Sequence, residues 1–116
     1  MKCDFSYSDV FEKEFKRLSK KYKSLKTDLA HLVKQIEENP ALGVSLGGGL
    51  RKIRMEISSK NKGKSGGGRI IIHEIIVQVE EENIRDVLLL TIYDKSEFSS
   101  IKPVTIKQII KDNREA

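Results

Sequence analysis

Apolar residues alternate with polar ones in some stretches of the chain and recur every three or four residues in others. Alternation over Lys2–Tyr7 predicts a short first strand. Helical spacing predicts two helices, from about Asp9 to Lys20 and from about Ser24 to Glu38, and Asn39-Pro40 ends the second. A last helix is expected from about Pro103 to Asp112. The first two helices are expected to form an antiparallel hairpin whose apolar stripes need a sheet to cover.

Three further extended segments predict strands, at Leu50–Ile57, Arg69–Val79 and Val87–Tyr93. A glycine-rich connection, Leu42–Gly49, precedes them, and a link over 58–68 is too polar and glycine-rich to be expected to pack. Short links favour an antiparallel meander. The predicted fold is a single α+β domain over residues 1–116 in the order βααβββα. Its small, antiparallel-rich sheet is expected to be covered on one face by the helices, a hairpin and a C-terminal helix.

Positive charge is concentrated in one stretch of the chain. The net charge is +5. Between Leu50 and Arg69 seven basic residues stand against a single acidic one, Glu56, so this basic segment carries +6 and the rest of the chain −1. A local basic field suits a polyanion such as nucleic acid. A solvated lysine-rich loop is the alternative explanation.

The strand expected at Leu50–Ile57 places basic side chains on one face. Because side chains alternate along a strand, Ile53 and Met55 share one face. Lys52 and Arg54 then share the other, and Arg69, which opens the next strand, can come alongside. Three convergent cations can grip a phosphate and stabilise a phosphorane-like transition state. A charged edge strand that resists aggregation is the alternative.

Familiar metal and nucleotide motifs are not found in the sequence. Cys3 is the only cysteine, which excludes an internal disulfide and a cysteine metal cluster. His31 is expected on the surface of a helix. His73 is a candidate for acid–base chemistry, although a lone strand histidine is more often structural. Gly63-Lys64-Ser65 resembles the end of a Walker loop, but the glycine that should precede it by five residues is absent. We therefore expect no metal, no cofactor and no ATP.

The hydropathy pattern offers no membrane segment. The longest apolar runs, Ile70–Ile72 and Val87–Leu90, are too short to cross a bilayer. The first residues lack the apolar stretch of a signal peptide. We therefore expect a cytoplasmic protein without a membrane partner.

Three segments taken together resemble the RelE/HigB toxin family. They are Gly49–Arg54, the lysine- and glycine-rich loop that ends in Gly68–Ile71, and Leu89–Glu97. The order of the expected elements is also similar to that of the family, and closest to the HigB-like branch with a long basic loop. The resemblance covers nearly the whole chain. It implies a compact microbial RNase-like fold and the toxin of a type II toxin–antitoxin system.

The resemblance also implies an activity, cleavage of mRNA in the ribosomal A site. The ribose 2′-OH would attack its own phosphate without a metal and leave a 2′,3′-cyclic end. The basic strand pair of the family falls on Lys52 and Arg54 and its arginine on Arg69, while Lys95 lies where relatives place further catalytic basic groups. Further RNA contacts are expected from the rest of the basic segment, at Arg51, Lys60, Lys62 and Lys64.

The implied partners are the mRNA, the rRNA and a cognate antitoxin. The antitoxin is expected to be a helix-turn-helix protein of the HigA type, and operator DNA is expected to be contacted only through it. Two departures from the family leave the general base open: Ser96 stands where many members have arginine, and Phe98–Lys102 holds no tyrosine, so that Tyr93 is the nearest phenol. A ParE-like gyrase inhibitor and a non-catalytic RNA-binding relic are the alternatives.

Overall fold

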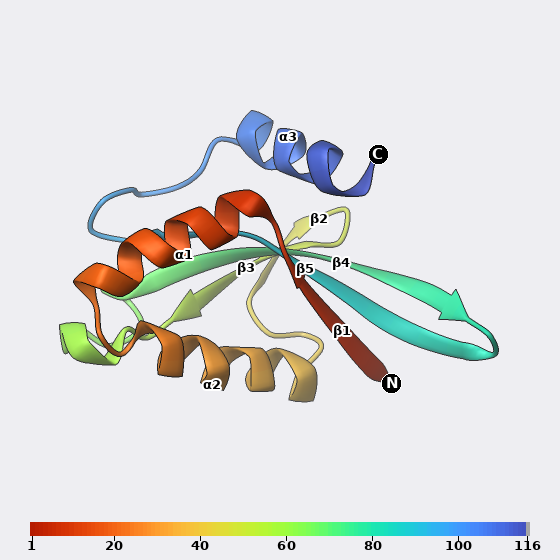
Figure 1. The fold of residues 1–116 in the computed structure, drawn as a ribbon, viewed down its shortest axis with the longest axis horizontal. Coiled ribbons are helices and arrows are strands. Elements are labelled where there is room, and N and C mark those ends of the chain that lie inside the picture. The colour runs from red at the N-terminus through yellow and green to blue at the C-terminus, as the bar shows by residue number, and fades with distance from the viewer. Residues whose placement is uncertain (116) are drawn as a thin grey trace.

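The fold is a five-stranded mixed sheet with three α-helices, seen in a computed structural model that describes residues 1–115 (Figure 1). The elements in chain order are β1 (Lys2–Tyr7), α1 (Asp9–Lys21), α2 (Leu25–Glu38), β2 (Val44–Gly47), β3 (Leu50–Met55), the short 3-10 helix η1 (Ser58–Lys60), β4 (Gly68–Val79), β5 (Glu82–Asp94) and α3 (Pro103–Arg114). The strands lie in the order β1-β5-β4-β3-β2. Only β1 and β5 pair in parallel, which confirms the predicted α+β class and the antiparallel-rich sheet.

Ser8 ties the start of α1 to the middle of the sheet. Its hydroxyl accepts a hydrogen bond from the Phe11 amide at 3.0 Å, as an N-cap does, and donates one to the Leu90 carbonyl at 2.6 Å. The side chain is fully buried. The first crossover from β1 into the helix hairpin is therefore fixed by one polar side chain.

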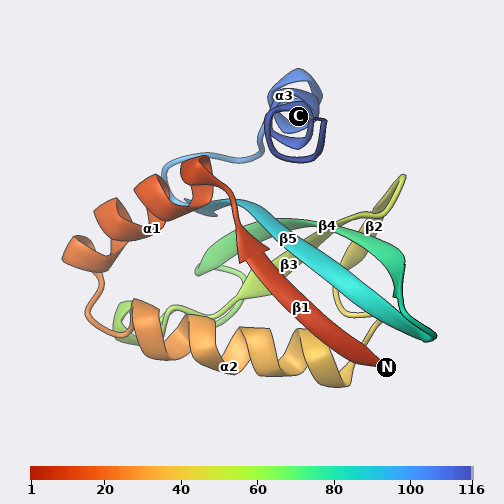
Figure 2. The same ribbon diagram turned by 45° about the vertical axis from the view of Figure 1, so that its right-hand side comes forward.

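Two separate apolar clusters form on the two faces of the sheet. The larger joins α1 and α2 to one face, with Phe11 and Leu32 from the helices and Ile53 from β3 among its members. The smaller joins α3 to the other face and includes Ile106 and Tyr93. The expectation that the helices cover one face of the sheet was therefore wrong. The helix α3 lies on the face opposite the hairpin (Figure 2).

The central strand β5 explains the second helical layer. Val87 and Leu89 belong to the cluster under the hairpin, while Leu88 and Leu90 belong to the cluster under α3. A strand that is apolar on both faces must be covered on both faces. The mostly apolar run from 87 to 93 was the signal in the sequence that both faces of this strand are covered.

The second correction is an additional strand, β2, in the segment expected to be a glycine-rich connection. Val44 pairs with Lys52 and Ser45 with Arg51 in an antiparallel register. Gly47 and Gly48 close the tight turn into β3 with φ values of 87° and 57°, which glycine adopts without steric cost. The observed order is therefore βααββββα. Beyond β2, the last residues of β3 form a free sheet edge.

The β4–β5 hairpin is longer than predicted and contains one irregularity. β5 begins at Glu82 rather than Val87, so the hairpin projects as a long arm (Figure 1). Ile71 pairs with Thr91 but Ile72 pairs with Leu89, so Leu90 has no partner in the register. This bulge shifts the alternation of side chains along β5 by one residue. None of the helices described here is long and apolar enough to cross a membrane.

Candidate functional site

The predicted alignment of basic residues across the strands is confirmed. Arg54 of β3 pairs directly with Arg69 of β4, and Arg69 pairs with Tyr93 of β5. Residues directly opposite one another in antiparallel strands share a face. Lys52 lies two residues from Arg54 and therefore on the same face, which is the face that α3 covers. Lys95 continues this alternation two residues after Tyr93.

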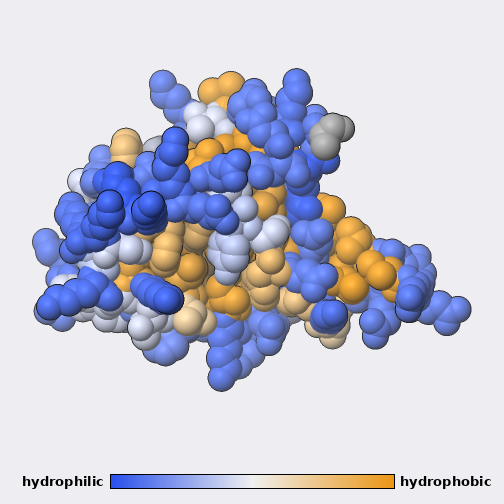
Figure 3. Space-filling view, viewed as in Figure 1, coloured by the Kyte–Doolittle hydropathy of each residue, from blue (hydrophilic) through white to orange (hydrophobic). Residues whose placement is uncertain are grey.

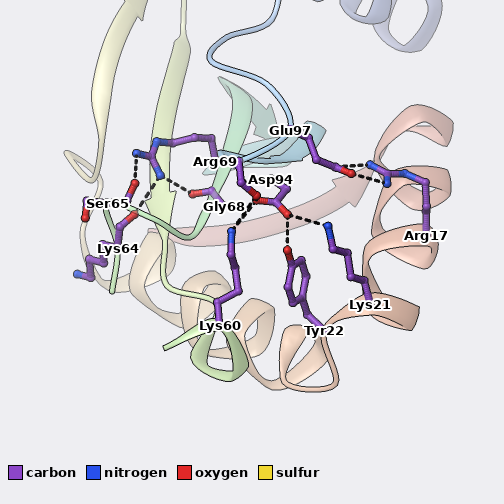
Figure 4. A network of polar contacts seen from close by, with 11 residues as sticks. Arg17, Lys21, Tyr22, Lys60, Lys64, Ser65, Gly68, Arg69, Asp94 and Glu97 are labelled. Atoms are coloured by element: carbon purple, nitrogen blue, oxygen red, sulfur yellow. Dashed lines mark hydrogen bonds and ion pairs between the residues drawn. The ribbon is translucent and has the colours of Figure 1, made fainter. Parts of the chain in front are cut away.

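Arg69 is buried and its guanidinium is engaged within the protein. It is 6% exposed and donates hydrogen bonds to the carbonyl oxygens of Lys64 at 3.0 Å, Gly68 at 3.0 Å and Ser65 at 3.2 Å (Figure 4). These contacts hold the end of the loop between β3 and β4. The geometry thus gives Arg69 a structural role in positioning this loop, which the sequence analysis did not foresee.

Lys60 also turns inward, although it was expected to be a loop cation available to RNA. Its ammonium group donates to Asp94 at 2.7 Å and to the Ser96 hydroxyl at 3.2 Å, and its side chain is only 7% exposed. Tyr22 and Lys21 approach the same carboxylate, the tyrosine by a hydrogen bond and the lysine at 3.7 Å (Figure 4). We call these five residues the Asp94 network.

Asp94 remains ionised because of these partners. The carboxylate is fully buried, and burial alone would raise its pKa. Hydrogen bonds from Lys60, Ser96 and Tyr22 outweigh the burial and hold the pKa of Asp94 well below its ordinary value. The Asp94 network is thus a charged hub that fastens the loop to α1 and to the end of β5.

The loop after β3 is anchored at its beginning as well. Asp28 of α2 accepts hydrogen bonds from the Ser58 amide at 3.0 Å and the Ser58 hydroxyl at 2.6 Å. Gly67 passes so close to β3 that a Cβ there would lie 2.2 Å from the Met55 carbonyl oxygen. The expectation that this loop would not pack was therefore wrong, because buried polar groups at both ends hold it. Its glycines permit close approach to the sheet.

Arg51, another predicted RNA contact, caps the connection between α2 and β2. Its guanidinium donates to the carbonyl oxygens of Leu42 and Ala41 at 2.7 Å and of Gly43 at 3.2 Å. Three of the seven cations of the basic segment therefore donate hydrogen bonds to acceptors within the protein. They are Arg51, Lys60 and Arg69. Arg54, Lys62 and Lys64 are exposed, and Lys52 is half-buried.

A cleft of about 120 Å³ lies between α2, the free edge of β3 and the loop. Arg54 and Lys64 line it together with two groups that can exchange protons, His31 and Glu56. Asp28 also lines it, but with its oxygens bonded to Ser24 and Ser58. The remaining lining residues are Leu32, Gln35, Met55 and Ser58. We refer to this site as the β3 cleft.

The β3 cleft combines the groups that a phosphodiester transesterification requires. Drug-sized ligands occupy sites of about 300–1,000 Å³, so this smaller volume suits a single phosphate group rather than a whole nucleotide. Arg54 and Lys64 can offset phosphate charge. His31 and Glu56 supply an imidazole and a carboxylate, both common general acids and bases. Arg54 therefore lies at the edge of the sheet, between the face that carries the predicted cationic row and the cleft beside α2 on the other face.

The other predicted site residues lie outside the β3 cleft. Lys95 is exposed, and its ammonium lies 3.4 Å from the Ser99 carbonyl oxygen. Tyr93 is 2% exposed, and burial raises the pKa of its phenol while Arg69 opposes the shift. His73 is half-buried opposite Leu50, and burial and then Arg114 lower its pKa. Within residues 1–115, no group of three or more acidic, histidine or cysteine side chains could hold a metal ion.

Comparisons with protein families and with solved structures give no match. No protein-family model matches the chain. No solved structure matches it at a significant level. The fold and the β3 cleft therefore define a small α+β domain with a cationic polar site.

Sequence reasoning missed two members of the β3 cleft. His31 was expected on the surface or flank of a helix, and Glu56 was expected on the same strand face as Lys52 and Arg54 but was given no role. Glu56 stands two residues from Arg54, directly after the end of β3, which was a local signal. His31 is separated from Arg54 by more than twenty residues. Only the packing of α2 beside the edge of β3 brings them to one cleft.

Proposed function

We propose that this protein is a RelE/HigB-type toxin, a ribosome-dependent endoribonuclease that cleaves mRNA and is neutralised by a cognate antitoxin. The observation that carries the proposal is the β3 cleft, where Arg54 and Lys64 accompany His31 and Glu56. The resemblance of the sequence to the family supports it. So does the arrangement of a helix hairpin and a C-terminal helix on an antiparallel-rich sheet.

The proposed reaction uses the nucleophile that RNA itself provides. A base in the cleft, Glu56 or His31, removes the proton of the ribose 2′-OH, and the oxygen attacks the adjacent phosphorus. The bond from phosphorus to the 5′ oxygen breaks, and the other group of the pair protonates that oxygen. The products are a 2′,3′-cyclic phosphate and a 5′-OH end. Arg54 and Lys64 stabilise the extra charge of the transition state.

The site differs from the one predicted from the sequence, because some of its cations are bonded within the protein. Arg69 contributes by holding Lys64 and Ser65 in place rather than by touching phosphate. Lys52 and Lys95 remain candidates for contacts to the RNA on either side of the cleaved bond. The cytoplasmic location and the helix-turn-helix antitoxin of the HigA type belong to the same proposal.

The test is cleavage of mRNA on programmed ribosomes by purified wild-type, His31→Gln and Glu56→Gln proteins. Loss of a general acid or base lowers rates by about 10²–10⁴-fold. Lys34→Gln on α2 and Glu38→Gln at its end serve as matched controls, because neither residue lines the cleft. Primer extension locates the cuts, and the chemistry of the 3′ ends identifies a cyclic phosphate. Full activity of both cleft variants would exclude this assignment of the acid and base.

A non-catalytic RNA-binding protein is the second candidate. It is favoured by one observation, that Arg51, Lys60 and Arg69 donate to acceptors within the protein. These three cations are therefore not available to stabilise a transition state. Such a protein would bind programmed ribosomes and leave the mRNA intact. The same assay therefore separates the two candidates when binding is measured beside cleavage.

A further inference from the structure

A second basic segment lies in the N-terminal half of the chain. Residues 13–26 contain seven basic side chains and one acidic one, a net charge of +6. The chain outside the two basic segments therefore carries −7. The positive charge is thus divided between two segments, and the second covers the end of α1, the turn that follows and the start of α2.

Five lysines of this segment form an exposed surface. Lys13, Lys16 and Lys20 are spaced three and four residues apart, which places them on the side of α1 that points away from the apolar core. Lys23 and Lys26 continue the surface across the turn. All five are exposed, and none takes part in an ion pair within the described residues 1–115. We call these five residues the α1–α2 lysine surface.

The stability of the helices accounts for only some of these lysines, because Lys13 and Lys16 follow Asp9 and Glu12 by four residues, a spacing that stabilises a helix. Like charges three or four residues apart on a helix repel one another. Lys20 lies in the last turn of α1, where a cation is favourable, but Lys26 lies in the first turn of α2, where a cation opposes the helix dipole. Lys23 directly precedes the N-cap of the same helix. Removing these two charges should stabilise the fold, so their presence points to a ligand.

The α1–α2 lysine surface is linked by hydrogen bonds to the loop that borders the β3 cleft. The Ser59 amide donates to the Ser24 hydroxyl at 2.9 Å, and the two hydroxyl groups also lie within hydrogen-bond distance at 2.9 Å. This end of the molecule, on the left in Figure 1, is covered mainly by hydrophilic side chains on the face that Figure 3 shows. Because each of the two basic segments carries +6, a ligand that contacts both of them is expected to be a polyanion.

The chemistry of the surface favours phosphates over bases. The segment holds two aromatic residues, Phe15 and Tyr22, and the half-buried Phe15 ring stacks on Phe11 with ring centroids 5.9 Å apart. In Tyr22 the ring is surrounded by cations. It lies 5.3 Å from the ammonium of Lys21 and 5.4 Å from that of Lys60, and the hydroxyl is bonded to Asp94. Both rings of this segment are thus already in contact with other side chains, whereas single-strand recognition depends on aromatic faces on which bases stack. Double-helical RNA presents backbone phosphates without unstacked bases.

We propose that the α1–α2 lysine surface binds the phosphate backbone of double-helical RNA, at a site separate from the β3 cleft. The stripe from Lys13 to Lys20 spans about 10 Å of helix. A comparable length of duplex carries roughly six phosphates. The identification of the polyanion as RNA rests on the proposed function, in which a ribosomal RNA helix would be contacted while the mRNA strand lies in the cleft.

The experiment measures binding rather than cleavage, so it remains informative if the protein does not cut RNA. A short RNA duplex and its separate single strands are titrated with wild-type protein over a range of salt concentrations. The test variant combines Lys16→Ala, Lys20→Ala, Lys23→Ala and Lys26→Ala. The control combines Lys34→Ala, Lys102→Ala, Lys107→Ala and Lys111→Ala, four exposed lysines elsewhere whose loss changes the net charge equally.

The expected result is a selective loss of duplex binding. Each phosphate contact contributes about 0.9 to the slope of log affinity against log salt, so the test variant should lose about 3 units of slope and about 10-fold or more in affinity. The control should keep both, and the test variant should melt no lower than wild type. Equal losses in the two variants, an unchanged slope, or a larger loss on single strands than on duplex would overturn the proposal.

Discussion

The Asp94 network and the β3 cleft lie at the same end of the molecule, and both take cations from residues 50–69. In the network, Lys60 pairs with a fully buried carboxylate that is held ionised. In the cleft, Arg54 and Lys64 are exposed, and neither takes part in an ion pair among the residues that the structure describes. Cations whose charge is already compensated stabilise the fold, while cations without a counter-ion remain available to a phosphate. Burial and pairing, rather than position in the basic segment, separate the two groups.

The largest expected effect separates activity from stability at Arg54. Arg54→Ala should lower the rate of mRNA cleavage by about 10²–10³-fold, because a preorganised donor to the transition state is lost. The free energy of unfolding should stay within about 0.5 kcal/mol of wild type, since the side chain is exposed. Single-turnover cleavage on saturated ribosomes and urea unfolding measure the two quantities. Lys107→Ala is the control, and wild-type cleavage by Arg54→Ala would remove Arg54 from the site.

Asp94→Ala should have the largest effect on stability. Removing the carboxylate leaves the ammonium of Lys60 buried without its partner, a change that costs about 3–5 kcal/mol in buried ion pairs. Urea unfolding should therefore show a loss of about 3 kcal/mol. Adding Lys60→Met should restore part of it. Glu97→Ala, which breaks an exposed ion pair with Arg17, should cost less than about 1 kcal/mol. A loss at Asp94 no larger than this control would contradict the network.

Arg69→Ala should destabilise the protein and loosen the loop. Three carbonyl oxygens lose their donor, and a loss of about 2 kcal/mol is expected from leaving buried acceptors unsatisfied. Trypsin should then cleave faster after Lys62 and Lys64, which lie in the segment that Arg69 holds. Arg69→Lys should recover only part of the stability, because one ammonium cannot reproduce the planar fork. Unchanged proteolysis in Arg69→Ala would show that the loop does not depend on this residue.

The smallest expected effect is a pH dependence that belongs to Asp94. Its pKa is lowered in the folded state, so the ionised group stabilises the fold at pH values above the usual aspartate pKa of about 3.9. That contribution is lost as the pH falls below this value through the lower pKa of the folded state. Asp94→Asn should therefore lose less stability than wild type between about pH 5 and pH 2.5. Parallel losses in the two proteins would assign the acid sensitivity to other groups.

Much of the fold could be predicted from local patterns. The helices begin and end within two residues of their predicted limits, because caps, Pro40 and apolar spacing are local signals. The register that sets Arg54 opposite Arg69 also followed from alternation and from a connection between neighbouring strands. The strand β2 was missed because the glycine run that forms its turn was interpreted as an irregular connection.

The candidate site was less predictable, because its members depend on packing between distant segments. Basic residue types marked the segment, but not which side chains would meet internal acceptors. Asp94 reaches Lys60 from 34 positions away, and Asp28 reaches Ser58 from 30 positions away. No local pattern reveals such pairs. The second basic segment is offset by acidic residues elsewhere, so the chain outside residues 50–69 sums to only −1 and its cations do not show in the net charge.

The bulge at Leu90 also limits how the length of this chain can change. Leu89 and Ile92 face the helix hairpin, and Asp94 follows on the same side only because one extra residue separates them. Loss of a single residue between 89 and 92 would turn Asp94 toward α3 and leave Lys60 without its counter-ion. By contrast, the exposed two-residue turn at Glu80 and Glu81, which follows the last pair Val79–Glu82, can lengthen without moving either face. Among variants of this sequence, insertions should therefore accumulate at the tip of the β4–β5 arm, and changes of length should be absent from the middle of β5.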